Sequence, residues 1–204
     1  MRKNMLDFNR TYILTNEIAE LRPLEKSHKD DLFMAGNNED IWTYFSEAGY
    51  GQENFEKYVD RALWMKVEGR EYPFVIKDVR TNEIAGMTRI YEYSSLFGNI
   101  KVGHTWIGKK FQGTGLNKAN KYLLFEFLFD QMHIKRIGFG ANANNATSIA
   151  AMKSVGCKEE GFLRSFLISK DGKRREDVIL LSILYEDWDG GVREELRGKV
   201  EKSK

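Results

Sequence analysis

Apolar and polar positions follow two different periods along the chain, and the changes between them predict the order of its elements. Alternating or short continuous apolar runs between turn residues predict strands at residues 17–24, 72–77, 84–93, 99–107, 134–140, 162–169 and 178–184. Apolar residues three and four positions apart predict helices at residues 28–36, 54–68, 113–132 and 147–155. The charged segment from Glu186 onward is expected to be partly helical.

Cap and turn residues refine these elements. Ser27 is expected to cap the helix at 28–36, and Gly156 is expected to end the helix at 147–155. The strands between 72 and 107 are joined by short turns, which favours antiparallel pairing. Parallel pairing is expected only where a helix intervenes, so the order of elements predicts a mixed α/β layered fold.

The composition is typical of one globular domain. The chain has 204 residues, of which 42% are hydrophobic and 30% are charged, which allows a sizeable core. It contains only 2 prolines and no linker rich in Gly, Ser or Pro. We therefore expect a single domain over residues 1–204, with a core at about 17–188 and a charged tail at 189–204.

Charge and cysteine content narrow the classes of function. The 32 Lys and Arg nearly balance the 30 Asp and Glu, which gives no argument for a nucleic-acid or membrane partner. No apolar run has the length of a membrane span or a signal peptide. Cys157 is the single cysteine, and we expect a small core residue there rather than a nucleophile. A reducing, cytoplasmic location is the corresponding expectation.

Residues 109–121 carry the clearest chemical signal. A predicted strand runs into Gln-Gly-Thr-Gly at 112–115 and a helix follows at once, so free amides of the first helical turn can bind a phosphate. Residues 101–121 include five lysines and no acid. A tight turn with solvated lysines is the alternative, and spacing leaves both open. The P-loop pattern is absent, and Lys118 replaces the third glycine of the Rossmann pattern.

Motifs along most of the chain share an order and spacing. They are LRPL (21–24), GHTWI (103–107), FQGTGLN (111–117), NNATSIAAMKSVG (144–156), EEGFLR (159–164), DGKRREDVILLSIL (171–184) and EDW (186–188). Together they resemble the GNAT superfamily of acetyl-CoA-dependent N-acetyltransferases, in the branch that includes the ribosomal-protein N-terminal acetyltransferases. The resemblance implies a central, mostly antiparallel sheet with helices on both faces and one parallel strand pair that splays apart.

The resemblance also implies where acetyl-CoA binds. The pantetheine arm would lie in the gap of the splayed pair, against the backbone of Thr105, Trp106 and Ile107. The pyrophosphate would be held by backbone amides of Gln112, Gly113, Thr114, Gly115, Leu116 and Asn117. Asn117 stands where the family usually has a small residue, which leaves its own amide contact open. No metal is implied.

Two residues near the start of the helix at 147–155 match positions that the family uses. Asn145 would hydrogen-bond near the thioester or the pantetheine arm, and Ser148 is a candidate proton donor to the leaving thiolate. The alternative is that both residues only start the helix, as their types often do. Met152 stands where many family members have a Tyr that acts as the general acid, and a Met side chain has no proton to donate.

The general base is not marked by a family motif. Relatives often carry Glu at positions matching Lys101 or Leu167, and neither residue accepts a proton usefully. His104 is the first candidate because imidazole titrates near neutrality, and Glu92 is the second. A strand histidine that faces solvent or binds a neighbour is the alternative for His104.

An acidic and aromatic segment is a candidate acceptor lining. Residues 31–56 contain six acids and no Lys or Arg, with Trp42, Tyr44, Phe45 and Tyr50 among them. In the family this stretch borders the acceptor groove, and such a lining would attract an ammonium group. The alternative is a solvated face whose aromatic side chains turn into the core.

These patterns predict direct transfer of an acetyl group from acetyl-CoA to a primary amine, on a protein N-terminus or a small molecule, in a ternary complex without a covalent carrier. The first alternative is a non-catalytic acyl-CoA-binding or regulatory module on the same fold. A nucleotide-binding oxidoreductase is the second, and the failed Rossmann pattern disfavours it. The acceptor and the oligomeric state stay open, with a homodimer as one option.

Overall fold

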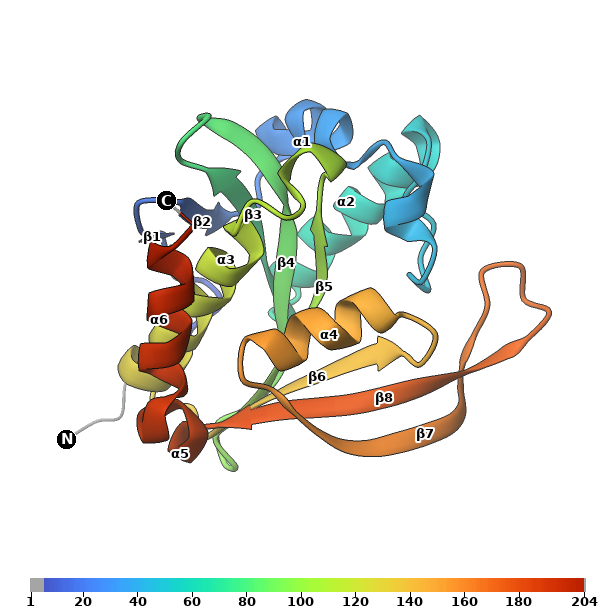
Figure 1. Cartoon of the computed structure of the whole chain (residues 1–204). Coiled ribbons are helices and arrows are strands. Elements are labelled where there is room, and N and C mark those ends of the chain that lie inside the picture. The colour runs from blue at the N-terminus through green and yellow to red at the C-terminus, as the bar shows by residue number, and fades with distance from the viewer. Residues whose placement is uncertain (1–5, 204) are drawn as a thin grey trace.

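The computed structural model describes residues 6–203, and at its centre lies an 8-stranded sheet in the order β1-β2-β3-β4-β5-β6-β8-β7 (Figure 1). Its strands are β1 (Leu14–Thr15), β2 (Ala19–Pro23), β3 (Glu71–Asp78), β4 (Glu83–Ser94), β5 (Asn99–Ile107), β6 (Arg136–Asn142), β7 (Lys158–Ile168) and β8 (Arg175–Leu184). Neighbouring strands are antiparallel except β5 and β6, which are parallel. The predicted mixed α/β fold with one parallel pair is confirmed.

Helices cover both faces of this sheet. The α-helices are α1 (Lys29–Gly36), α2 (Gln52–Val67), α3 (Leu116–Phe125), α4 (Ala146–Ser154), α5 (Tyr185–Asp187) and α6 (Arg193–Glu201). Shorter turns of 3₁₀ or π type are η1 (Lys26–His28), η2 (Glu39–Trp42), η3 (Lys109–Phe111), η4 (Glu126–Gln131) and η5 (Trp188–Val192). In residues 6–203, none of the helices has both the length and the apolar character that crossing a membrane requires.

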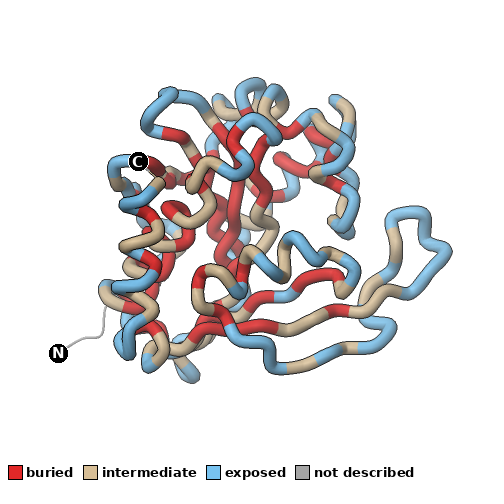
Figure 2. The backbone as a smooth tube through the Cα atoms, viewed as in Figure 1, coloured by how far each residue is buried: buried red, intermediate tan, exposed pale blue. Residues whose placement is uncertain are grey.

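Two apolar clusters hold the helix layers to the sheet. In Figure 2, buried residues are concentrated along the central strands. On the side of α1 and α2, the indole rings of Trp42 and Trp106 lie 5.6 Å apart and contact Phe55. On the side of α3, α4 and α6, Leu116 and Leu123 are buried with the inner residues of the strands. Because side chains of β5 are buried in both clusters, this central strand is fixed from both faces.

β5 carries one extra residue in its middle. Met87 pairs with Trp106 while Arg89 pairs with Gly103, so His104 and its neighbour together oppose a single residue of β4. His104 takes a φ of +47° at this β-bulge. Register is recorded between β5 and β6 only from Asn99–Arg136 to Lys101–Gly138, and the two strands then diverge (Figure 1). We call the gap between β5 and β6 beyond Lys101 the fork, and it confirms the expected splay.

Two predicted element boundaries are wrong. Ser27 lies inside η1 rather than at a cap, and the turn is closed by the backbone N–H of Glu25, which donates to Nδ1 of His28. The helix expected from residue 113 begins only at α3, because Gly113 and Gly115 have φ values of +78° and +83° that no α-helix accommodates. That helix also continues in π form after α3. The short strand β1 carried no sequence pattern long enough to predict it.

Candidate functional site

The turn between β5 and α3 is fixed by its own side chains. The side-chain amide Nε2 of Gln112 donates to the carbonyl O of Ile107 at 2.9 Å. The hydroxyl Oγ1 of Thr114 donates to the carbonyl O of Phe111 at 2.7 Å. These bonds hold residues 112–117, which we call the amide loop, in one conformation before any ligand arrives.

The amide loop offers a row of free backbone donors. In the described part of the chain, no backbone N–H from Gly113 to Lys118 donates to a backbone carbonyl, and the series resumes with Ala119, which donates to O of Gly115 at 3.1 Å. These donors lie at the positive end of the α3 dipole, where an anion is stabilised. A Cβ added at Gly113 would meet no atom within 4 Å, so the space at this point of the loop is open.

Residues distant in sequence contact the amide loop and support its conformation. Arg80 Nη1 donates to the carbonyl O of Thr114 at 3.2 Å and to that of Ser203 at 3.0 Å. Asp78 fixes this guanidinium with both carboxylate oxygens, at 3.0 and 2.6 Å. Ser203 lies so close that its Cβ would be 2.2 Å from a Cβ at Gly115. The end of the chain therefore packs against the loop, a contact for which the sequence holds no local signal.

A buried lysine lies at the fork. Lys121 of α3 is 4% exposed, and its Nζ donates to Oγ1 of Thr105 on β5 at 2.9 Å. The same ammonium is 5.8 Å from the ring centre of Phe139 on β6, so it is close to both strands of the splayed pair. Burial lowers the pKa of Lys121 to about 8. In the sequence, Lys121 is distinguished only as one of the five lysines between residues 101 and 121.

His104 lies at the bulge of β5, on the strand that forms one side of the fork. Its imidazole packs edge-on against Tyr91 of β4, with ring centres 5.7 Å apart. Burial, with smaller contributions from Arg89 and Arg61, lowers the pKa of His104 to about 3. The ring is therefore neutral at physiological pH and holds an added proton weakly. Burial also raises the pKa of Tyr91 to about 12.

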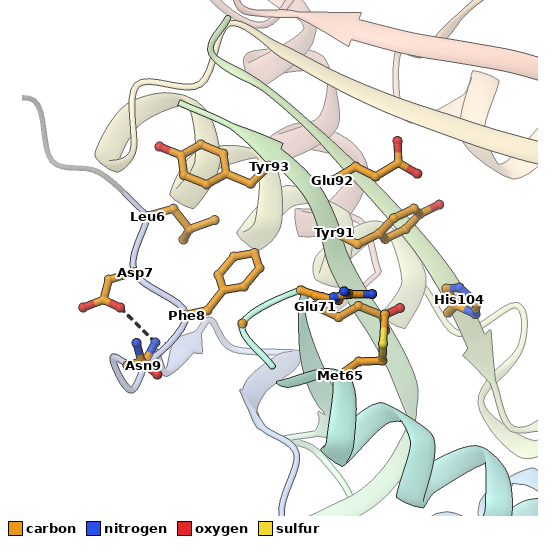
Figure 3. A pocket seen from close by; sticks show the side chains of 12 residues that line it. Leu6, Asp7, Phe8, Asn9, Met65, Glu71, Tyr91, Glu92, Tyr93 and His104 are labelled. Atoms are coloured by element: carbon orange, nitrogen blue, oxygen red, sulfur yellow. Dashed lines mark hydrogen bonds between the residues drawn. The ribbon is translucent and has the colours of Figure 1, made fainter. Parts of the chain in front are cut away.

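A cavity of about 860 Å³ leads to this histidine (Figure 3). It lies between the N-terminal segment from Leu6 to Asn9, the end of α2 and strands β4 and β5. Half of the residues that line it are aromatic or acidic, and Arg70 and His104 also belong to the wall. The aromatic and acidic residues are Asp7, Phe8, Glu71, Tyr91, Glu92 and Tyr93. Two of its carboxylates already have cationic partners, Glu71 with Arg89 at 3.1 Å and Glu92 with Lys101 at 2.6 Å. We call this space the N-terminal cavity.

Asn145 and Ser148 lie at the start of α4. The side-chain Oδ1 of Asn145 accepts the backbone N–H of Ser148 at 3.0 Å, which is a helix cap. Asn145 therefore caps α4, as the alternative interpretation expected. This cap does not test whether Asn145 also binds a ligand. β5 and β6 are parallel and then diverge, so the amide loop follows one strand of the fork and the α4 start follows the other. Met152 is buried in the core.

The acidic and aromatic segment does not line the N-terminal cavity. No residue of 31–56 belongs to its wall. Trp42 is completely buried, which agrees with the alternative in which the aromatic side chains of this segment turn into the core. Tyr44 and Tyr50 are exposed. The wall instead includes Leu6–Asn9, a segment without any motif. Across residues 6–203, no group of His, Cys, Asp and Glu side chains is arranged to hold a metal ion.

Comparisons with known proteins agree with this architecture. Residues 19–158 match the family model described as an acetyltransferase (GNAT) domain. A putative ribosomal N-acetyltransferase YdaF of Bacillus subtilis (strain 168) is 26% identical over 182 residues, which cover 86% of this chain and 96% of that protein. A GCN5-related N-acetyltransferase from Brucella melitensis superposes with a TM-score of 0.85 at 21% identity, over 94% of this chain and 86% of that one.

A second solved structure adds information about ligands of a protein with this fold. The spermidine N-acetyltransferase from Vibrio cholerae, solved in complex with CoA and spermine, has a TM-score of 0.69 and 20% identity. The match covers 85% of this chain and 99% of that one. At this identity the likeness establishes a common fold.

Proposed function

The chain belongs to the GNAT acetyltransferase family, and on that premise we propose that it transfers the acetyl group of acetyl-CoA to a primary amine by direct attack in a ternary complex. The observation that carries this proposal is the amide loop at the edge of the fork, with its unpaired donors and open space at Gly113. We include the tail in the same functional domain because Ser203 packs against the loop.

The residues of the site fit acetyl-CoA. Amides of residues 112–117 would bind its pyrophosphate, and the α3 dipole adds favourable charge. The backbone of Thr105, Trp106 and Ile107 faces the fork beyond the last recorded β6 pair, so its polar groups are candidates to bond the pantetheine amides. When bound, acetyl-CoA supplies an activated acetyl group that an amine can take up directly. The chain's part is to hold both reactants in line.

We assign the N-terminal cavity to the acceptor. The carboxylate of Asp7, which forms no salt bridge within residues 6–203, would attract an ammonium group, and the rings of Tyr91 and Tyr93 would cover it. The names of the similar proteins, a ribosomal N-acetyltransferase and a spermidine N-acetyltransferase, support an amine on a protein or a polyamine as the acceptor class. A neutral amine must form before attack, so a proton acceptor near the bulge is required.

His104 and Glu92 are the candidate proton acceptors. His104 is close to the fork, but its low pKa makes it a weak base. Glu92 is a carboxylate on the cavity wall. If His104 is the base, the variant His104→Asn loses the acidic limb of the rate profile against pH, whereas an unchanged profile in that variant rejects this role. Glu92→Gln tests the second candidate by the same measurement.

We propose for Asn145 and Ser148 the roles that the family resemblance implies. Asn145 would bond the pantetheine arm near the thioester, in addition to capping α4. Ser148 would donate a proton to the leaving thiolate. Unchanged turnover in Ser148→Ala removes Ser148 as a proton donor.

The decisive experiment combines binding and turnover on the full chain. We expect calorimetry to detect binding of CoA and acetyl-CoA, and a thiol assay to detect CoA release with at least one amine from a panel of polyamines, peptides with free N-termini, amino acids and amino sugars. No heat from either CoA form would contradict the proposal. Binding without thiol release would favour a non-catalytic acyl-CoA module, an alternative that Met152 and the weakly basic His104 keep open.

A further inference from the structure

Lys121 is a charged side chain in a place where an apolar one would be easier to bury. Its neighbours on the buried face of α3 include Leu116, Ala119, Leu123 and Leu124. Removing an ammonium from water is costly unless it is paired. Within residues 6–203, no carboxylate forms a salt bridge with Lys121, and its recorded hydrogen-bond partner is the hydroxyl of Thr105. The packing of the helix gives no reason for a cation here.

The surroundings of Lys121 leave donor capacity unused. An ammonium has three N–H groups, and one of them donates to Oγ1 of Thr105, which in turn lies 2.8 Å from Oγ1 of Thr88. From β6, the group that faces Nζ is the ring of Phe139, which accepts only weakly. After α4, the titratable group near Lys121 is Cys157, whose pKa burial raises to about 12, so the thiol stays neutral.

We propose that Lys121, rather than the candidate Ser148 named above, is the proton donor to the sulfur of coenzyme A as the acetyl group leaves it. This inference rests on the proposed function, because it requires the pantetheine arm to lie in the fork beside Thr105. The neutral amine nitrogen forms a bond to the acetyl carbon and gives up one proton to the proton acceptor of the proposed function. The carbon–sulfur bond breaks, and the sulfur keeps the electron pair. The proton from Nζ then neutralises the sulfur, and the amine of Lys121 regains a proton from solvent after the products leave.

Other side chains near the fork are less suited to this step. Met152 has no proton, and the buried thiol of Cys157 gives one up only at high pH. Tyr122 is next to Lys121 in sequence, but its hydroxyl donates to Glu126 and its ring packs on Trp188. Lys121 is held by Thr105 on the very strand against which the pantetheine arm would lie.

The acidity of Lys121 fits the task. A proton donor works best when its pKa is close to that of the group it protonates and to the working pH. Burial brings the pKa of Lys121 to about 8, near that of an ordinary thiol. Below that pH the side chain is charged and can donate, and above it the donor form is lost.

The first test replaces the amine and measures turnover. Lys121→Met keeps length and apolar volume, whereas Lys121→Gln keeps a head group that can still donate a hydrogen bond to Thr105. We expect both variants to lower kcat by about 10²-fold or more, with KM for acetyl-CoA within about threefold of wild type. The wild-type rate should fall as pH rises through about 8, and both variants should lose that limb. The matched control is Lys153→Met, an exposed lysine of α4 that pairs with Glu159.

The second test measures the bound thiol without turnover. The ultraviolet absorbance of the thiolate reports the titration of CoA bound to the protein. In the wild type, the neighbouring ammonium should lower the pKa of that thiol, and Lys121→Met should raise it again, while Lys153→Met should not change it.

Three results would overturn the inference. Wild-type kcat in Lys121→Met shows that no proton comes from Lys121, and wild-type kcat in Lys121→Gln alone shows that only its hydrogen bond matters. A lower kcat with an unchanged titration of bound thiol shows that Lys121 acts through the fold. A wild-type protein that binds no CoA contradicts the proposed function itself, so the two failures are distinguishable.

Discussion

At the scale of single residues, buried polar groups decide the chemistry of the site. Arg89 is completely buried, donates to Glu71 at 3.1 Å and lies over the ring of Tyr58 at 4.4 Å. Lys121 is also buried and His104 is half-buried at the cavity wall, and burial lowers the pKa of each. Each group is therefore kept closer to its neutral form than it would be in solvent. Their titration should be visible in both stability and rate.

The histidine at the bulge should make the protein sensitive to acid. Its pKa is about 3 in the fold and 6.5 when exposed, so the unfolded chain binds more protons between these values. The free energy of unfolding should fall as pH decreases from 6.5 toward 3, by up to about 1.4 kcal/mol per pH unit from this one group. In His104→Asn, denaturant unfolding at several pH values should show a shallower slope. Asn also tolerates the positive φ.

His133 is a matched control for that measurement. It is exposed and likewise has a positive φ, of +55°. His133→Asn makes the same substitution at an exposed site with the same kind of backbone, so the comparison isolates the effect of the half-buried position of His104. An equal slope in the wild type and His104→Asn would show that His104 does not resist protonation in the fold.

The buried pair between Arg89 and Glu71 should be costly to break from one side. Glu71→Gln leaves the guanidinium buried without its counter-charge, and we expect a loss of about 3–5 kcal/mol in the free energy of unfolding. The exposed pair of Lys57 and Glu53 gives the comparison, since Glu53→Gln should change the free energy of unfolding far less. Urea unfolding of the two variants and of the wild type measures both changes in the free energy of unfolding. Equal losses in the two variants would contradict this account.

At the scale of elements, the amide loop depends on a strand and a helix that meet at two glycines. Gly113 and Gly115 both take positive φ, but their surroundings differ. Gly113 faces open space, whereas Gly115 packs against Ser203. The first glycine is therefore a place where charge can be changed with little effect on packing, and the second is a structural contact.

A negative charge at Gly113 should abolish binding of the anionic ligand. We expect Gly113→Asp to weaken binding of CoA by at least about tenfold, because the carboxylate occupies the position where the free amides attract anions. Calorimetry with CoA measures the change. Gly172→Asp is the matched control, since Gly172 also has a positive φ of +71° and no atom within 4 Å of an added Cβ. Undiminished affinity in Gly113→Asp would place the pyrophosphate elsewhere.

At the scale of the whole molecule, the site is assembled from segments far apart in sequence. The tail of the chain, the turn after β3 and the amide loop meet at Arg80, through Thr114 and Ser203. Near the opposite end of β3, which begins at Glu71, the first described residues of the chain line the N-terminal cavity together with His104. Both ends of the described chain thus contribute to the shape of the site (Figure 1).

Removing the guanidinium should loosen the loop without touching the reacting groups. We expect Arg80→Met to raise KM for acetyl-CoA by about threefold to tenfold with kcat little changed, because an ordered loop loses its outer support. Steady-state kinetics at saturating amine measures both constants. Lys173→Met, in the exposed turn between β7 and β8, is the control. A fall in kcat at constant KM would be inconsistent with a supporting role for Arg80.

The sequence by itself determined the order of the elements, the antiparallel run over β3, β4 and β5, and the amide loop. Each of these depends on neighbours in sequence: a period of apolar residues, a short turn, or glycines before a helix. Through the resemblance to the GNAT family, the same local motifs also predicted the fold. The family model that matches residues 19–158 agrees with that prediction.

Only the tertiary structure decided where side chains meet. The bulge at His104, the position of Lys121 beside Thr105, the ion pair of Arg89 and the wall of the N-terminal cavity all depend on strand register and on contacts between distant segments. No local pattern encodes them, because register and burial are set by the packing of the whole sheet between its two helix layers. The pKa values that govern the chemistry follow from that burial.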